Sequence, residues 1–184
     1  MQNMNIPEHN LQLMILSQDE AQELVARQPG HWQIISIWGK LDGSPADFGR
    51  ATRILHLGFD DVTADDAEEG FVAATEADIV RALEFTRQAW PGPLLIHCHA
   101  GVSRSPALAW VVLWDRLGAT IPAAQEALDI VHRVRPDIEP NPHIMRLGVM
   151  HLCGNPAAEK QIWAKVEAMR RAMLFPGGPP QASV

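Results

Sequence analysis

The chain has 184 residues, of which 47% are hydrophobic and 20% are charged, and its formal net charge is −7. These values are typical of one globular domain with a single hydrophobic core, and they exclude a disordered or fibrous chain. An acidic chain lacks the broad basic surface that attracts nucleic acids and anionic membranes, so we expect neither as a partner.

The two cysteines, Cys98 and Cys153, are too few for a disulfide scaffold. We therefore expect free thiols. The polar N-terminus carries no signal-peptide pattern, and no apolar run approaches the roughly 20 residues of a membrane-spanning helix. Together these features predict a cytoplasmic protein.

Short apolar runs alternate along the chain with amphipathic stretches that carry helix-start and helix-stop signals. Ser17 followed by Glu20 forms a capping-box pattern, and Thr75 opens a later helix. The predicted elements, in chain order, are a strand at 11–16, a helix from 17 to about 27, strands at 33–38 and 53–59, a helix from 75 that ends before Pro91, a strand at 94–97, and helices at 106–117, 121–134, 143–152 and 157–174.

Strands that alternate with helices predict an α/β fold, a three-layer sandwich with a central, mostly parallel sheet flanked by helices. We expect one domain over residues 1–174, with its core at about 11–152 and a C-terminal helix at 157–174. The Pro- and Gly-rich residues 175–184 are predicted to be a disordered tail. In such sheets, binding sites lie beyond the carboxyl ends of the strands, so the turn after residues 94–97 is the first place to look.

That turn contains the pattern Cys-x5-Arg. Its sequence is His97-Cys98-His99-Ala100-Gly101-Val102-Ser103-Arg104-Ser105. The bare pattern is weak, but here an apolar strand delivers Cys98, a glycine allows the loop to curl, and Arg104 lies where a helix begins.

A tight loop between a strand and a helix turns successive N–H groups inward and binds anions. The backbone amides expected to surround a phosphate are those of His99, Ala100, Gly101, Val102, Ser103 and Arg104. Arg104 can add a bidentate fork to two phosphate oxygens. The same positive field would hold Cys98 as a thiolate, an in-line nucleophile beneath the phosphate. Ser105 could donate a hydrogen bond to the sulfur, and this chemistry needs no metal.

A leaving oxygen needs a proton, and Asp60 and Asp61 follow the strand at 53–59 on an acidic loop. A carboxylic acid at the same sheet edge could donate that proton and then activate water, a contribution that is typically about 10²–10⁴-fold. A solvated loop residue is the alternative interpretation of either aspartate.

Two histidines flank the cysteine and suggest a metal site. Side chains alternate along a strand, so His97 and His99 would point away from Cys98 and three ligands would not converge. We expect no metal, and we expect His97 to hydrogen-bond the loop from behind. Asn141 could tie its Pro-rich turn to the site, although an ordinary turn residue is the preferred interpretation.

On these residues the sequence resembles the protein tyrosine and dual-specificity phosphatase superfamily, most of all its compact bacterial members. The resemblance rests on His97-Cys98-x5-Arg104-Ser105, on the segment 57–62 and on the segment 140–142, and it covers roughly residues 11–152. It implies a tyrosine-phosphatase-like fold, with Cys98 as nucleophile, Arg104 as phosphate ligand and Ser105 assisting the leaving thiolate. It also implies an aspartate as general acid, which we place at Asp61 with Asp60 as the alternative.

The implied function is a cysteine-dependent phosphomonoester hydrolase that acts through a phospho-cysteine intermediate. The expected substrate is a phosphorylated protein or a small phosphomonoester, and the expected inhibitors are the oxyanions phosphate, sulfate and vanadate. The loop interior has no lysine, which favours a singly phosphorylated group over a polyanionic inositol phosphate.

Two other functions fit parts of the pattern. A non-catalytic phosphate-binding module would keep the loop and the arginine but lose the nucleophile or the acid, and both are present here. A thiol-based transferase, such as a rhodanese or an arsenate reductase, would also use a loop cysteine. Rhodanese loops are typically shorter, and an arsenate reductase needs resolving cysteines, of which only Cys153 remains.

Overall fold

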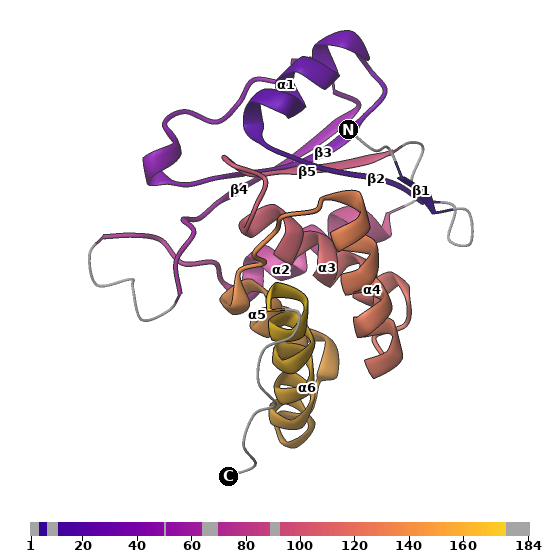
Figure 1. Cartoon of the computed structure of the whole chain (residues 1–184). Helices are drawn as coiled ribbons and strands as arrows, with labels where there is room; N and C mark the ends of the chain where they lie inside the picture. The colour runs from indigo at the N-terminus through magenta and orange to yellow at the C-terminus, as the bar shows by residue number, and fades with distance from the viewer. Residues whose placement is uncertain (1–3, 7–10, 50, 64–69, 89–92, 176–184) are drawn as a thin grey trace.

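One five-stranded sheet, in the order β1-β2-β5-β3-β4, forms the centre of the molecule (Figure 1). The computed structural model describes residues 4–6, 11–49, 51–63, 70–88 and 93–175. The strands are β1 (Met4–Ile6), β2 (Leu11–Leu16), β3 (Gln33–Trp38), β4 (Arg53–Gly58) and β5 (Leu94–His97). β1 is antiparallel to β2, and the other pairs are parallel, so the predicted, mostly parallel sheet is confirmed.

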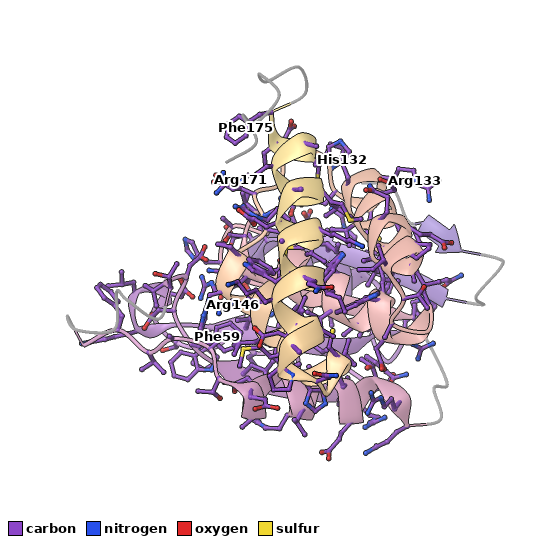
Figure 2. All side chains as sticks on the ribbon, turned by 90° about the horizontal axis from the view of Figure 1, so that it is seen from below. Phe59, His132, Arg133, Arg146, Arg171 and Phe175 are labelled. Carbon is purple, nitrogen blue, oxygen red and sulfur yellow. The ribbon has the colours of Figure 1, made fainter. Side chains whose placement is uncertain are left out.

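Helices cover both faces of this sheet. They are α1 (Gln18–Arg27), α2 (Glu76–Arg87), α3 (Arg104–Arg116), α4 (Ile121–Val134), α5 (Pro142–Cys153) and α6 (Pro156–Leu174). α1 lies on one face and the other helices lie on the opposite side, which confirms the predicted three-layer sandwich (Figure 1). Figure 2 shows α6 across the outside of the helical layer, with Arg171 and Phe175 towards its C-terminal end.

Local sequence signals set most helix starts. The capping box of α1 is present, because Ser17 Oγ accepts from the Glu20 amide and a Glu20 carboxylate oxygen accepts from the Ser17 amide at 2.7 Å. α3 begins at Arg104, two residues before the predicted start at Pro106, because proline is tolerated in the first turn of a helix.

Two features, β1 and a short 3-10 helix, go beyond the expectation. β1 was not predicted, since three residues are too few to show a period. A short 3-10 helix, η2 (Lys40–Asp42), interrupts the expected loop at 39–49. The predicted tail lies, apart from Phe175, outside the described residues, and the single domain stays a prediction.

Alternate residues of the central strands face two separate cores. Leu95 faces α1 together with Phe48, while Leu94, Ile96 and Cys98 belong to the cluster around α3. β5 is buried over its whole length, so the chain leaves the centre of the sheet directly into the turn that carries Cys98. Among the described residues, no helix is both long and apolar enough to cross a membrane.

α3 is the most deeply buried helix, with every residue from Arg104 to Trp114 buried. Trp110 and Trp114 stack with their ring centroids 5.0 Å apart. Their indole N–H groups donate to the carbonyls of Ala124 and Thr120 at 2.9 and 2.7 Å, which fixes α4 against α3. α5 approaches α3 at Gly148, where an added Cβ would lie 2.5 Å from Val111 Cγ2.

Gly148→Ala should therefore destabilise the protein by about 1–2 kcal/mol in urea unfolding. Overpacking costs typically about 1–3 kcal/mol, and the better helix propensity of alanine offsets part of that cost. In a Val111→Ala background the new methyl group has room, so the same substitution should be neutral or stabilising. A stabilising effect of Gly148→Ala in the wild-type background would contradict the close approach of the two helices.

Candidate active site

The turn between β5 and α3 is held from outside by its carbonyl groups. His99 O accepts from Gln18 N at 3.1 Å, Ala100 O from Arg135 Nη2 at 3.3 Å, Val102 O from Glu139 N at 2.9 Å, and Ser103 O from Asn141 N at 3.2 Å. In a trans peptide the N–H points opposite to the C=O. With these carbonyls turned outward, the N–H groups that follow them face the inner side of the loop, as an anion-binding nest requires.

Gly101 allows the loop to pass close to the end of β2. Its φ is +72°, and a Cβ added there would lie 2.7 Å from the backbone atoms Leu16 C and Ser17 N. Backbone atoms cannot move aside as a flexible side chain can. The loop therefore needs glycine at this position for both conformation and space.

A pocket of about 570 Å³ opens over this loop. Its lining residues are Asp61, Cys98, His99, Ala100, Val102, Ser103, Arg104, Glu139 and Pro142. The structure thus brings the predicted nucleophile, most of the predicted phosphate-binding loop and Asp61 to one place, although Asp61 lies 37 positions before Cys98 in the sequence.

Cys98 lies at the floor of the pocket and is 2% exposed. Its Sγ is 3.3 Å from the hydroxyl oxygen of Ser105, which is itself buried in the first turn of α3. The sulfur therefore lies at the N-terminus of a helix and beside a hydroxyl group.

Arg104 is buried at the same floor, and an aspartate holds one side of its guanidinium. Nη1 donates to Asp42 Oδ2 at 2.7 Å and to the Phe59 carbonyl at 3.1 Å, and Nη2 donates to Asp42 Oδ1 at 3.2 Å. Nε is buried and has no partner in the described structure. One edge of the guanidinium, formed by Nε–H and the second Nη2–H, is left to bind two oxygens of an anion.

The Arg104–Asp42 pair also sets the charges of both groups. Burial would lower the pKa of Arg104, but its hydrogen bonds to Asp42 and the nearby Cys98 and Asp61 raise it above its ordinary value. Burial would likewise raise the pKa of Asp42, and the bonds from Arg104 and from the Gly39 amide hold it below its ordinary value. Both groups are therefore charged near neutral pH. Asp42 has no sequence motif that would have identified it.

The two candidate acids have different environments. Asp60 is 5% exposed, and its two carboxylate oxygens accept from the backbone amides of Lys40 at 2.6 Å and Val72 at 2.8 Å. Asp61 is exposed and lines the pocket, and its Oδ1 accepts from Ser103 Oγ at 2.8 Å. Asp60 thus connects two loops, whereas Asp61 lines the same pocket as Cys98.

Asn141 contributes to both the turn and the site. Its side-chain oxygen caps α5 by accepting from the amides of His143 and Ile144 at 2.9 and 3.1 Å. Its side-chain nitrogen donates to Asp61 Oδ1 at 2.8 Å. The interpretation as an ordinary turn residue is therefore incomplete, because the same amide also orients Asp61.

The two histidines point to different surroundings. His97 is fully buried on the α1 face, with its ring 4.9 Å from that of Phe48 and its Nδ1 3.4 Å from the Cys98 carbonyl. His99 is exposed, with Nδ1 3.9 Å from Asp42 Oδ1. Within the described ranges, no three His, Cys, Asp or Glu side chains are grouped as metal ligands.

Burial lowers the pKa of His97 from 6.5 to about 4, although its hydrogen bond to the Cys98 carbonyl acts in the opposite direction. Between pH 6.5 and pH 4 the unfolded chain therefore binds more protons at His97 than the folded chain does, so stability should fall as the pH is lowered through this range. We expect a loss of about 2 kcal/mol in the free energy of unfolding between pH 7 and pH 5.

Urea titrations at several pH values measure this slope. His97→Asn should flatten it, while His31→Asn, which removes an exposed imidazole, should leave it unchanged. An unaltered slope in His97→Asn would mean that another group carries the pH dependence.

Solved structures with the same arrangement of strands and helices identify the fold. A human tyrosine phosphatase-like serine/threonine/tyrosine-interacting protein matches with a TM-score of 0.54 and 21% identity, over 70% of this chain and 80% of its own. The phosphatase domain of Yvh1 from Chaetomium thermophilum matches with a TM-score of 0.53 and 22% identity, over 80% and 93%. DUSP15 matches with a TM-score of 0.53 and 15% identity, over 95% and 94%.

The chain has the fold of the tyrosine and dual-specificity phosphatases. No protein-family model matches it, and no curated protein matches it in sequence. In this phosphatase fold the chain places Cys98 and Arg104 in the turn after the central strand, as the resemblance in sequence implies.

Proposed function

We propose that the protein is a cysteine-dependent phosphomonoester hydrolase that forms a phospho-cysteine intermediate on Cys98. The observation that carries this proposal is the unpartnered edge of Arg104, which is buried in the same pocket as the sulfur. A buried N–H group without a partner is costly, so this edge is suited to an anionic ligand. A reducing cytoplasm would keep the thiol free, and we place the enzyme there.

Substrate binding uses the loop and the arginine together. The inward N–H groups surround the phosphoryl oxygens, and the free edge of Arg104 donates two parallel hydrogen bonds to two of them. These donors are held before the substrate arrives, because the carbonyls of the loop and the Asp42 side of the guanidinium already have partners. The phosphorus atom is thereby placed over the Cys98 sulfur.

In the first step, the Cys98 thiolate attacks phosphorus and the bond to the leaving oxygen breaks. Asp61, in its carboxylic acid form, transfers its proton to that oxygen. In the second step, the Asp61 carboxylate accepts a proton from water, the water oxygen attacks phosphorus, and the sulfur–phosphorus bond breaks. Ser105, 3.3 Å from the sulfur, donates a hydrogen bond that stabilises the departing thiolate.

Cys98→Ser should lower kcat for para-nitrophenyl phosphate by at least about 10³-fold, because a serine hydroxyl in this site is a far weaker nucleophile. Vanadate and phosphate should still bind, measured by calorimetry, since the loop and Arg104 are intact. Cys153→Ser, which changes the half-buried thiol outside the pocket, should keep wild-type activity. Wild-type turnover in Cys98→Ser would overturn the mechanism, and binding without turnover in the wild type would favour a phosphate-binding module.

Asp61→Asn should lower kcat about 10²-fold for an alkyl phosphate and much less for para-nitrophenyl phosphate, whose leaving group needs little protonation. Its pH–rate profile should also lose the acid-dependent limb. Asp60→Asn should instead lower the melting temperature, since an amide cannot accept from both the Lys40 and Val72 amides. If the leaving-group effect follows Asp60 rather than Asp61, the assignment of the acid is wrong.

A further inference from the structure

The phosphate pocket is poor in positive charge. Among its described lining residues, Arg104 is the one arginine or lysine, and its charge is already paired with Asp42. The lining also includes the carboxylates of Asp61 and Glu139. A phosphate dianion that enters this pocket therefore meets little net attraction beyond the loop amides and the free edge of Arg104.

The segment between α4 and α5 adds an acidic rim to this pocket. Ile138 is 5% exposed and points into the core, so its neighbours Asp137 and Glu139 are exposed. Glu139 lines the phosphate pocket, and its backbone is fixed by the bond from its amide to Val102 O at 2.9 Å. Neither carboxylate has a hydrogen bond or ion pair with a described residue, unlike those of Asp42, Asp60 and Asp61.

A second pocket of about 480 Å³ adjoins the first, and the two share Val102. Asp137 lines it together with Arg135 and Glu20, whose side chains pair with each other at 2.5 Å. Burial would raise the pKa of Glu20, but the Ser17 amide and Arg135 lower it, so this carboxylate is charged and neutralises Arg135. Asp137 remains as the uncompensated charge of the second pocket.

Among the described residues, no arginine or lysine other than Arg104 and Arg135 lines either pocket. Figure 2 shows Arg133, Arg146 and Arg171 on the helical layer around α6, and none of them lines either pocket. The first pocket, which we propose binds phosphate, has the unpaired carboxylate of Glu139 in its lining, and the second pocket has that of Asp137. This arrangement suits a ligand with charges of both signs.

We propose that the substrate is a phosphopeptide with a lysine or arginine next to the phosphorylated residue, and that Glu139 and Asp137 select it. This inference rests on the proposed function. The phosphate occupies the pocket over Cys98, and the basic side chain lies along the rim, where it pairs with Glu139 or reaches Asp137 in the second pocket. The substrate's own cation thus cancels the repulsion that Glu139 exerts on the phosphate. The second pocket gives the flanking residue a place to lie, which a small zwitterionic phosphomonoester would not use.

The test compares two phosphopeptides that differ only in lysine or glutamate at the positions flanking the phosphorylated residue, each made with phosphotyrosine and with phosphothreonine. At low ionic strength the wild-type protein should cleave the lysine peptide with a kcat/KM about tenfold higher than that for the glutamate peptide, and 0.5 M salt should reduce this ratio.

Glu139→Gln should reduce the ratio of the two kcat/KM values severalfold. Adding Asp137→Asn to that variant should reduce the ratio further, and Glu139→Lys should invert it. Glu84→Gln, which removes one carboxylate from α2 and lines neither pocket, is the matched control and should leave the ratio unchanged.

Binding to Cys98→Ser, measured by fluorescence anisotropy, separates this inference from the proposed reaction. If this variant prefers the lysine peptide while the wild type hydrolyses no phosphomonoester, the rim selects as proposed and the hydrolase proposal fails. If the wild type hydrolyses para-nitrophenyl phosphate but the two peptides react and bind equally, or the glutamate peptide is preferred, the inference is overturned and the hydrolase stands. Cleavage of phosphoethanolamine with the same kcat/KM as the lysine peptide would overturn the assignment to a peptide.

Discussion

The geometry of the pocket depends on the buried ion pair between Arg104 and Asp42. Asp42 presents both carboxylate oxygens to the guanidinium, at 2.7 and 3.2 Å, and the Phe59 carbonyl accepts a further N–H. An uncompensated charge at this depth would destabilise the fold by about 3–5 kcal/mol. The pair therefore allows a side chain that is 5% exposed to stay charged at the floor of a pocket, and it decides which edge of the guanidinium a ligand can reach.

The loop around the sulfur is likewise held in one conformation by partners outside it. Its four outward carbonyls are bound by the start of α1, by Arg135 and by the segment before α5, so three separate parts of the chain fix the direction of its amides. Donors held in this way need no reorganisation when charge develops on a bound group. The preorganisation depends on several parts of the chain, because the groups that donate to these carbonyls lie outside the loop.

Most of the fold was predictable because its signals are local. In the part of the chain that the structure describes, hydrophobic periods, a capping box and Pro–Gly breaks located the six α-helices and four of the five strands. β1 could not be found, since three residues carry no period. In the site, Cys98, Arg104 and Ser105 are close in sequence, so their spacing alone placed them in one turn.

The rest of the site depends on tertiary contacts. Asp42 lies 62 positions before Arg104, and the two meet only because β3 pairs with β5 and brings η2 to the same edge of the sheet. The sequence could not choose between Asp60 and Asp61 either, because adjacent acids share the same local context. The amides of Lys40 and Val72, which bind Asp60, make the difference.

The anchoring of Asp60 has a consequence for its neighbour. Asp60 is held at both carboxylate oxygens by the backbone amides of Lys40 and Val72, which fixes the chain at the position before Asp61. Asn141 and Ser103 then orient the exposed side chain of Asp61, because both donate to its Oδ1. Two adjacent identical residues thus divide into a buried support and an exposed side chain that lines the pocket.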